Sequence, residues 1–182
     1  MKYALDLSKK FGLDISKKMK SLSTGYSSIA KIITAMASGV EIVIYDEPVL
    51  GLDANHRELF YKELMQDYIE NPKTIILSTH IIEEVSSLLE SVVILNDRKI
   101  VNTEEAEDLL NKVYKISGLS QNVDKYIESK EIINIESLSN YKSVTVLGEI
   151  KREDKELAEN LELEFSKVEL QKLFIYLTSK GE

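Results

Sequence analysis

Apolar residues in the first hundred positions follow two patterns, short continuous runs and stripes at helical spacing. The runs Ile42–Tyr45 and Thr74–Leu77 have the length and composition of buried strands. Stripes predict helices over 26–37, from Asp53 to the stop at Asn71-Pro72, and over 81–89. Because strand and helix alternate, we expect a parallel sheet covered on both faces.

Flanking segments complete the predicted first domain. Residues 3–20 read as helix, turn, helix, with Gly12 and Asp14 near the break. Residues 92–95 and 99–101 form a strand pair joined through Asn96-Asp-Arg98. The composition then changes, because Thr103-Glu-Glu-Ala-Glu-Asp begins an acidic helix. We therefore predict domains at 1–102 and 103–182.

The second domain shows short strands and helices in the order βαββαβα. The predicted strands are 113–116, 132–138, 143–147 and 163–168, and the predicted helices are 123–129, 154–161 and 170–179. This order favours a small α+β domain of ferredoxin-like fold. The fold class expected for the whole chain is thus α/β followed by α+β.

Composition excludes several classes of protein. The 182 residues are 43% hydrophobic and 30% charged, the balance of a folded globular chain. Neither a membrane-spanning run nor a signal peptide is visible. Zero cysteines and two histidines exclude thiolate and multi-histidine metal sites. A net charge of -8 argues against a broad nucleic-acid surface.

Candidate chemistry gathers at the carboxyl ends of the two predicted strands. Asp46 and Glu47 end the first strand, where paired carboxylates suit a hard cation and a water molecule. His80 follows the second strand. Taken singly, the carboxylates could be ordinary loop residues and the histidine a structural one. The motifs around them decide between these readings.

Two further motifs lie nearby. Leu22-Ser-Thr-Gly-Tyr26 opens a predicted helix, so Ser23 and the Gly25 amide stand where free N–H groups and the positive dipole end favour a phosphate. Ser23 could equally be a simple helix cap. Gly51-Leu-Asp53 provides a turn and a second helix cap.

Taken together, the four segments resemble motifs of ABC transporter ATPase subunits, in the family's order. The signature motif matches Leu22–Tyr26 and Walker B matches Tyr45-Asp-Glu-Pro48. The D-loop matches Gly51-Leu-Asp53 and the switch histidine matches Ser78-Thr-His80. The resemblance implies an incomplete P-loop NTPase-like sheet and ATP with magnesium as cofactors. It also implies a partner membrane permease, a homodimer or heterodimer of ATPase subunits, and a cytoplasmic location on the inner face of the membrane. No direct nucleic-acid contact is expected.

The same resemblance assigns a role to each matching residue. Asp46 would help to hold magnesium, Glu47 would polarise the attacking water and His80 would contact the γ-phosphate. Two further roles cross the dimer. Ser23 and Gly25 would contact a nucleotide held by the opposing subunit, and Asp53 would couple the two nucleotide sites. His56 has no matching role and is expected at the surface. Thr24 and Tyr26 depart from the common signature Leu-Ser-Gly-Gly-Gln, which changes the contacts available to phosphate.

Two motifs of the family are missing from these residues. Gly-x-x-x-x-Gly-Lys-Ser/Thr, which grips the β- and γ-phosphates, does not occur, and a Q-loop is not found. We therefore expect the C-terminal portion of a longer ATPase, inactive alone, whose shortened sheet leaves apolar surface exposed. Two alternatives are the C-terminal half of a DNA-repair or chromosome-maintenance ATPase and a non-catalytic regulatory module.

Overall fold

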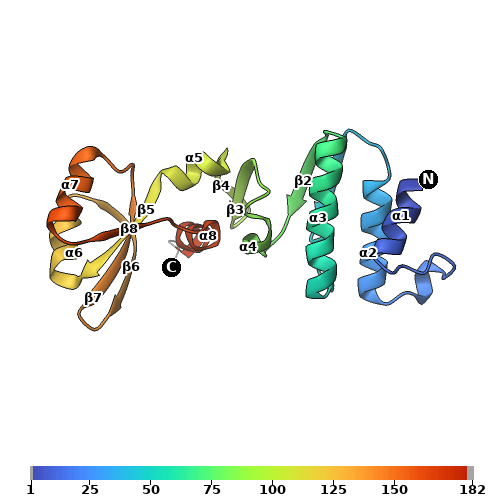
Figure 1. The fold of residues 1–182 in the computed structure, drawn as a ribbon, viewed down its shortest axis with the longest axis horizontal. Helices are drawn as coiled ribbons and strands as arrows, with labels where there is room; N and C mark the ends of the chain where they lie inside the picture. Colours follow the sequence, from blue (N-terminus) through green and yellow to red (C-terminus); the bar gives the residue numbers. More distant parts are fainter. Residues whose placement is uncertain (1, 180–182) are drawn as a thin grey trace. The chain divides into compact units, whose positions relative to one another are not determined.

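The computed structural model describes residues 2–179, which fold as two compact units that divide between Ile81 and Ile82 (Figure 1). The first unit contains a two-stranded parallel sheet and its helices. Its elements are α1 (Lys2–Lys10), the 3₁₀ helix η1 (Met19–Ser21), α2 (Thr24–Met36), β1 (Ile42–Asp46), α3 (Ala54–Glu70) and β2 (Thr74–Ser78). The predicted strand–helix–strand order is confirmed.

The sheet of the first unit is covered on one face. Val43 and Tyr45 point into the core, where the Tyr45 ring meets Phe60 of α3 edge-on at 5.6 Å. Their neighbours Ile42 and Ile44 are 61% and 68% exposed on the other face. The expectation that helices would cover both faces is wrong, because α2 and α3 both pack on one side. The open apolar face agrees with the shortened sheet that the sequence predicts.

The second helix predicted within residues 3–20 is also wrong. Gly12 has a left-handed φ of +63°, which ends the first helical segment. The Asp14 carboxylate then accepts hydrogen bonds from the Ser16 N–H at 3.0 Å and the Ser16 hydroxyl at 2.7 Å. This local turn competes with the helix, so only the short η1 forms before Leu22.

The second unit contains a hairpin and a four-stranded antiparallel sheet. Its elements are α4 (Ile82–Val85), β3 (Ser91–Asn96), β4 (Lys99–Glu105), α5 (Ala106–Asn111), β5 (Val113–Leu119), α6 (Ser120–Tyr126), β6 (Glu131–Leu138), β7 (Tyr141–Leu147), α7 (Arg152–Asn160), β8 (Glu164–Ser166) and α8 (Leu170–Ser179). The strand order β6-β7-β5-β8 with antiparallel pairing is that of a ferredoxin-like sheet. The predicted fold class is confirmed.

Helices α6 and α7 cover one face of this sheet (Figure 1). Tyr114 and Ile116 of β5 pack there against Val123 of α6 and Ala158 of α7. Residues of β5 alternate between the two faces because successive side chains of a strand point in opposite directions. The period-2 pattern was therefore a sound guide to this sheet.

The hairpin of β3 and β4 turns through Asp97 and Arg98, both with positive φ, at +48° and +62°. Two such residues form the tight turn whose twist matches antiparallel strands. The ladder runs on to Glu105, so the acidic helix expected from Thr103 begins only at Ala106. The helix expected over 81–89 is also shorter, since α4 ends at Val85.

Packing of the hairpin bears on domain organisation. Ile94 of β3 belongs to a buried cluster with Leu109 of α5 and Leu173 of α8. The hairpin therefore lies within the second compact unit, which begins at Ile82. The predicted division into domains 1–102 and 103–182 stays a prediction. Within residues 2–179, every helix is too short or too polar to cross a membrane.

Candidate functional site

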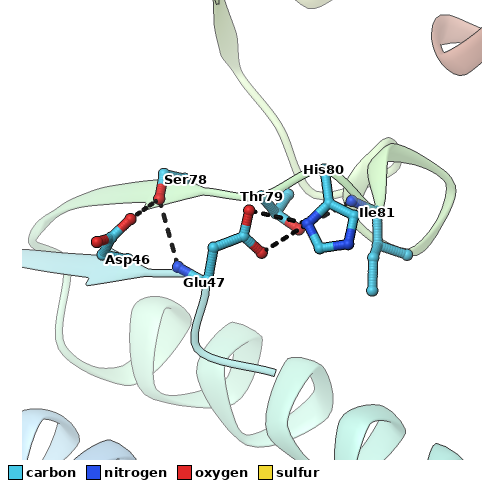
Figure 2. Close-up of polar contacts among 6 residues, drawn as sticks. All are labelled: Asp46, Glu47, Ser78, Thr79, His80 and Ile81. Atoms are coloured by element: carbon cyan, nitrogen blue, oxygen red, sulfur yellow. Dashed lines mark hydrogen bonds and ion pairs between the residues drawn. The ribbon is translucent and has the colours of Figure 1, made fainter. Parts of the chain in front are cut away.

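The parallel register of β1 and β2 brings two motif residues together at the strand ends. Asp46 pairs with Ser78 across the sheet, and the Ser78 hydroxyl donates a 2.5 Å hydrogen bond to Asp46 Oδ1 (Figure 2). Both side chains are exposed at this edge. The Ser78 hydroxyl thus fixes one oxygen of the carboxylate and leaves its surroundings open to solvent.

Glu47 leaves the strand with an unusual backbone conformation. Its φ is +44°, a region that residues with a Cβ rarely adopt. Its N–H donates to the Ser78 carbonyl at 3.0 Å and lies 3.3 Å from the Ser78 hydroxyl. Such strained residues are held by their surroundings and concentrate at functional sites. The turn directs the Glu47 side chain away from the strand and toward His80 (Figure 2).

Glu47 and His80 form the second contact of this edge. His80 Nδ1 lies 2.9 Å from both carboxylate oxygens of Glu47. The Glu47 side chain is 33% exposed and the His80 side chain 67% exposed. Just beyond, the Thr79 hydroxyl accepts a 3.0 Å hydrogen bond from the Ile81 N–H, which fixes the start of the following segment. A carboxylate and a histidine therefore share one solvent-open edge. We call Asp46, Glu47, Ser78 and His80 the carboxylate edge.

A magnesium ion would find only part of its ligands here. Among the described residues, no three or more His, Asp or Glu side chains are grouped to hold a metal ion. Mg²⁺ in nucleotide sites commonly takes one or two carboxylates and fills its other positions with phosphate oxygens and water. Asp46, with its second oxygen at an exposed strand end, fits that partial role. The site fits magnesium only together with a phosphate ligand.

The signature segment contacts the Gly51–Asp53 turn within the same unit. Ser23 is the N-cap of α2 and lies 3.4 Å from the Tyr26 N–H. A Cβ added to Gly25 would lie 3.0 Å from the Gly51 carbonyl oxygen. Gly51 has φ +81°, and a Cβ there would meet the Thr24 methyl at 3.7 Å. Gly25 therefore permits close approach of the two backbones, and the left-handed φ favours glycine at position 51. We call this approach of Gly25 and Gly51 the glycine contact.

Asp53 and His56 hold the other side of this turn. Asp53 is the N-cap of α3, and its carboxylate accepts a 3.0 Å hydrogen bond from the His56 N–H. His56 Nδ1 lies 2.7 Å from the second Asp53 oxygen. The backbone and ring N–H groups of His56 hold the pKa of Asp53 below its usual value. The ionised carboxylate therefore stabilises the fold, and that contribution is lost as the pH falls through the lowered pKa.

The expectation that His56 is merely a surface residue is wrong. Its side chain is 25% exposed and contacts Phe11, just after α1, and Tyr26 of α2 as well as Asp53. The spacing of Asp53 and His56 from N-cap to third helical position was the signal available in the sequence. The contact of Ser78 with Asp46 is a second one that the motifs alone do not predict. Equal strand lengths were the clue that Ser78 would lie opposite Asp46.

Comparisons with known proteins find ABC transporter ATP-binding proteins. No protein-family model matches the chain. It is 32% identical over 106 residues to the ABC transporter ATP-binding protein NatA of Bacillus subtilis, covering 57% of this chain and 43% of NatA. It is 34% identical over 120 residues to an uncharacterized ABC transporter ATP-binding protein of Methanocaldococcus jannaschii, covering 65% and 45% of the two chains.

Over these residues, the chain is similar in sequence to ABC transporter ATP-binding proteins. It spans less than half the length of either ABC transporter relative. A solved ATP-binding subunit of an ABC transporter aligns with a TM-score of 0.55 at 24% identity, covering 59% of this chain and 45% of that chain. This structural similarity confirms the ABC ATPase fold that the motifs predict, over the aligned part of the chain.

Proposed function

We propose that the chain supplies part of an ATP-hydrolysing site of the ABC type, and that a phosphate loop on another polypeptide segment completes the site. The observation that carries this proposal is the carboxylate edge, where Asp46 meets Ser78 and Glu47 meets His80 at adjacent parallel strand ends. Ligands of open α/β sheets bind outside the carboxyl ends of the strands. Relatives named as ATP-binding proteins supply the ligand class.

Glu47 is the general base of this site. Its carboxylate accepts a proton from the attacking water, which becomes the nucleophile toward the γ-phosphate. His80 Nδ1 contacts both Glu47 oxygens, so it can orient the carboxylate before water binds. The exposed His80 ring can also reach a phosphate oxygen. The two residues act as one unit, because each side chain is oriented by its contact with the other.

Asp46 would hold magnesium together with a bound nucleotide. The chemistry supplied by a magnesium ion at this residue would be neutralisation of phosphate charge. Ser78 fixes the Asp46 carboxylate through its hydroxyl and also receives the Glu47 backbone N–H on its carbonyl. Ser78 therefore sets the spacing between the metal-binding and the water-activating carboxylates.

Ser23 and Gly25 serve a nucleotide held by a second ATPase subunit. They stand at the N-terminus of α2, a helix of 13 residues whose free N–H groups favour an anion. Asp53 follows Gly51 of the glycine contact by two residues and couples the two subunits. In this proposal the complete protein dimerises on a membrane permease at the cytoplasmic face and drives transport.

The chain on its own is expected to show no ATP hydrolysis, because its residues contain no glycine-rich phosphate loop. Mixing it with a polypeptide that carries the phosphate loop of an ABC transporter ATP-binding protein should produce magnesium-dependent phosphate release. The measurement compares each component alone with the mixture at equal protein concentration.

A mixture with His80→Ala serves as the matched control for a contaminating ATPase. Release that persists with this variant would come from another enzyme. Turnover by the chain alone, or no stimulation although the two polypeptides form a complex, would contradict the proposed division of the site.

A further inference from the structure

We infer that His56 is a positioning residue that holds the Gly51–Asp53 turn against the Ser23–Tyr26 segment. This role deepens the proposed function, because the contact of the Ser23–Tyr26 segment with a nucleotide rests on that function. The contacts themselves are independent of that function. His56 is one of two histidines in the chain and is distinct from the histidine of the carboxylate edge.

The His56 ring lies where three helices of the first unit meet. It stacks on Phe11, which follows α1, at 6.3 Å between ring centroids and 13° between planes. Tyr26 of α2 meets it edge-on at 6.0 Å and 72°. Asp53, the N-cap of α3, lies 2.7 Å from Nδ1. One side chain thus joins the start of α3 to both of the preceding helices.

Both ring nitrogens face hydrogen-bond acceptors. Nδ1 faces the Asp53 carboxylate and Nε2 lies 3.3 Å from the Phe11 carbonyl oxygen. A neutral imidazole carries hydrogen on one nitrogen, whereas the imidazolium carries it on both. The two contacts are therefore hydrogen bonds together only in the imidazolium form, and loss of one proton releases one of them. Among the described contacts of the ring, the titratable side chains are those of Asp53, the N-cap of α3, and Tyr26 of α2.

These contacts bracket the glycine contact. Tyr26 directly follows Gly25, and Asp53 stands two residues after Gly51. The backbones of Gly25 and Gly51 approach so closely that a Cβ on Gly25 would be 3.0 Å from the Gly51 oxygen. Because His56 touches the neighbours of both glycines, its protonation changes how firmly the signature segment and the turn are held together.

The test is an NMR titration of the isotopically labelled chain without nucleotide, between about pH 5 and 8, where histidine changes charge. We expect the amide resonances of Gly25 and Gly51 to shift with the same midpoint as the His56 ring protons. In His56→Gln the shared titration should be lost. In the matched variant His80→Gln it should persist, since His80 contacts Glu47 instead.

Two results would overturn the inference. In the first, Gly25 and Gly51 do not respond while the His56 ring titrates. In the second, their response survives in His56→Gln. The wild-type titration decides the matter even if that variant fails to fold. Because no nucleotide is present, failure here is separable from failure of the proposed ATP site, which phosphate release measures.

Discussion

Glu47→Gln is expected to lower magnesium-dependent ATP hydrolysis by about 10²–10⁴-fold in the mixture with a phosphate-loop polypeptide, the usual contribution of a general base. Glutamine keeps the size of the side chain and its contact with His80, but its amide does not accept a proton from water. ATP binding should be retained, so the loss falls on kcat. Phosphate release and equilibrium nucleotide binding measure the two effects separately.

Glu41→Gln is the matched control for this experiment. Glu41 is exposed and precedes the same strand, β1, without belonging to the carboxylate edge. This variant should hydrolyse ATP at the unsubstituted rate. Equal losses in Glu41→Gln and Glu47→Gln would indicate a general charge effect, and an active Glu47→Gln protein would remove Glu47 from the reaction.

Asp67→Ala is expected to destabilise the first unit by about 3–5 kcal/mol, the cost of leaving a buried charge without its partner. Asp67 Oδ2 lies 2.8 Å from Lys73 Nζ, and the two side chains are only 3% and 7% exposed. Asp67 Oδ1 also accepts a 3.2 Å hydrogen bond from Asn71. This cluster ties the end of α3 to the start of β2. Denaturant unfolding measured on the first unit checks the effect.

Two comparisons isolate the unpaired charge as the cause. Lys17→Ala breaks an ion pair with Asp14 whose side chains are 58% and 50% exposed, and should leave the free energy of unfolding almost unchanged. Asp67→Leu combined with Lys73→Met removes both buried charges and should be far less harmful than Asp67→Ala. A double variant as unstable as the single one would show that packing, and not charge, causes the loss.

Local sequence patterns predicted the regular elements well where pattern and tertiary contacts agree. The runs Ile42–Tyr45 and Thr74–Leu77 became β1 and β2 with one further residue each. The strand and helix order after residue 112 produced the ferredoxin-like sheet. In both places the period of apolar positions coincides with the face that is buried.

Predictions failed where a side chain or a partner strand competes with the local preference. The Asp14 turn replaced a predicted helix, and pairing with β3 extended β4 to Glu105. The prediction that helices cover both faces of the first sheet failed for another reason. Continuous apolar runs show that a strand can be buried on two faces, but not whether the layers that would cover both faces are present. Ile44 and Ile76 thus remain 68% and 50% exposed.

For the candidate site, the motifs indicated which residues matter but not how they touch. Adjacent strand ends were predictable from parallel order, and the contact of Ser78 with Asp46 follows from equal register. The left-handed backbone of Glu47 was not predictable, since nothing in Asp46-Glu47-Pro48 demands it. The His56 contacts were missed because Phe11 and Tyr26 reach the ring from distant parts of the sequence.

The most direct measurement is a structure of Glu47→Gln bound to ATP and magnesium together with the phosphate-loop polypeptide. We expect the γ-phosphate within one water molecule of residue 47, magnesium beside Asp46, and the Ser23–Gly25 segment of a second copy on the same nucleotide. ATP bound away from both the carboxylate edge and the signature segment would contradict the proposed site.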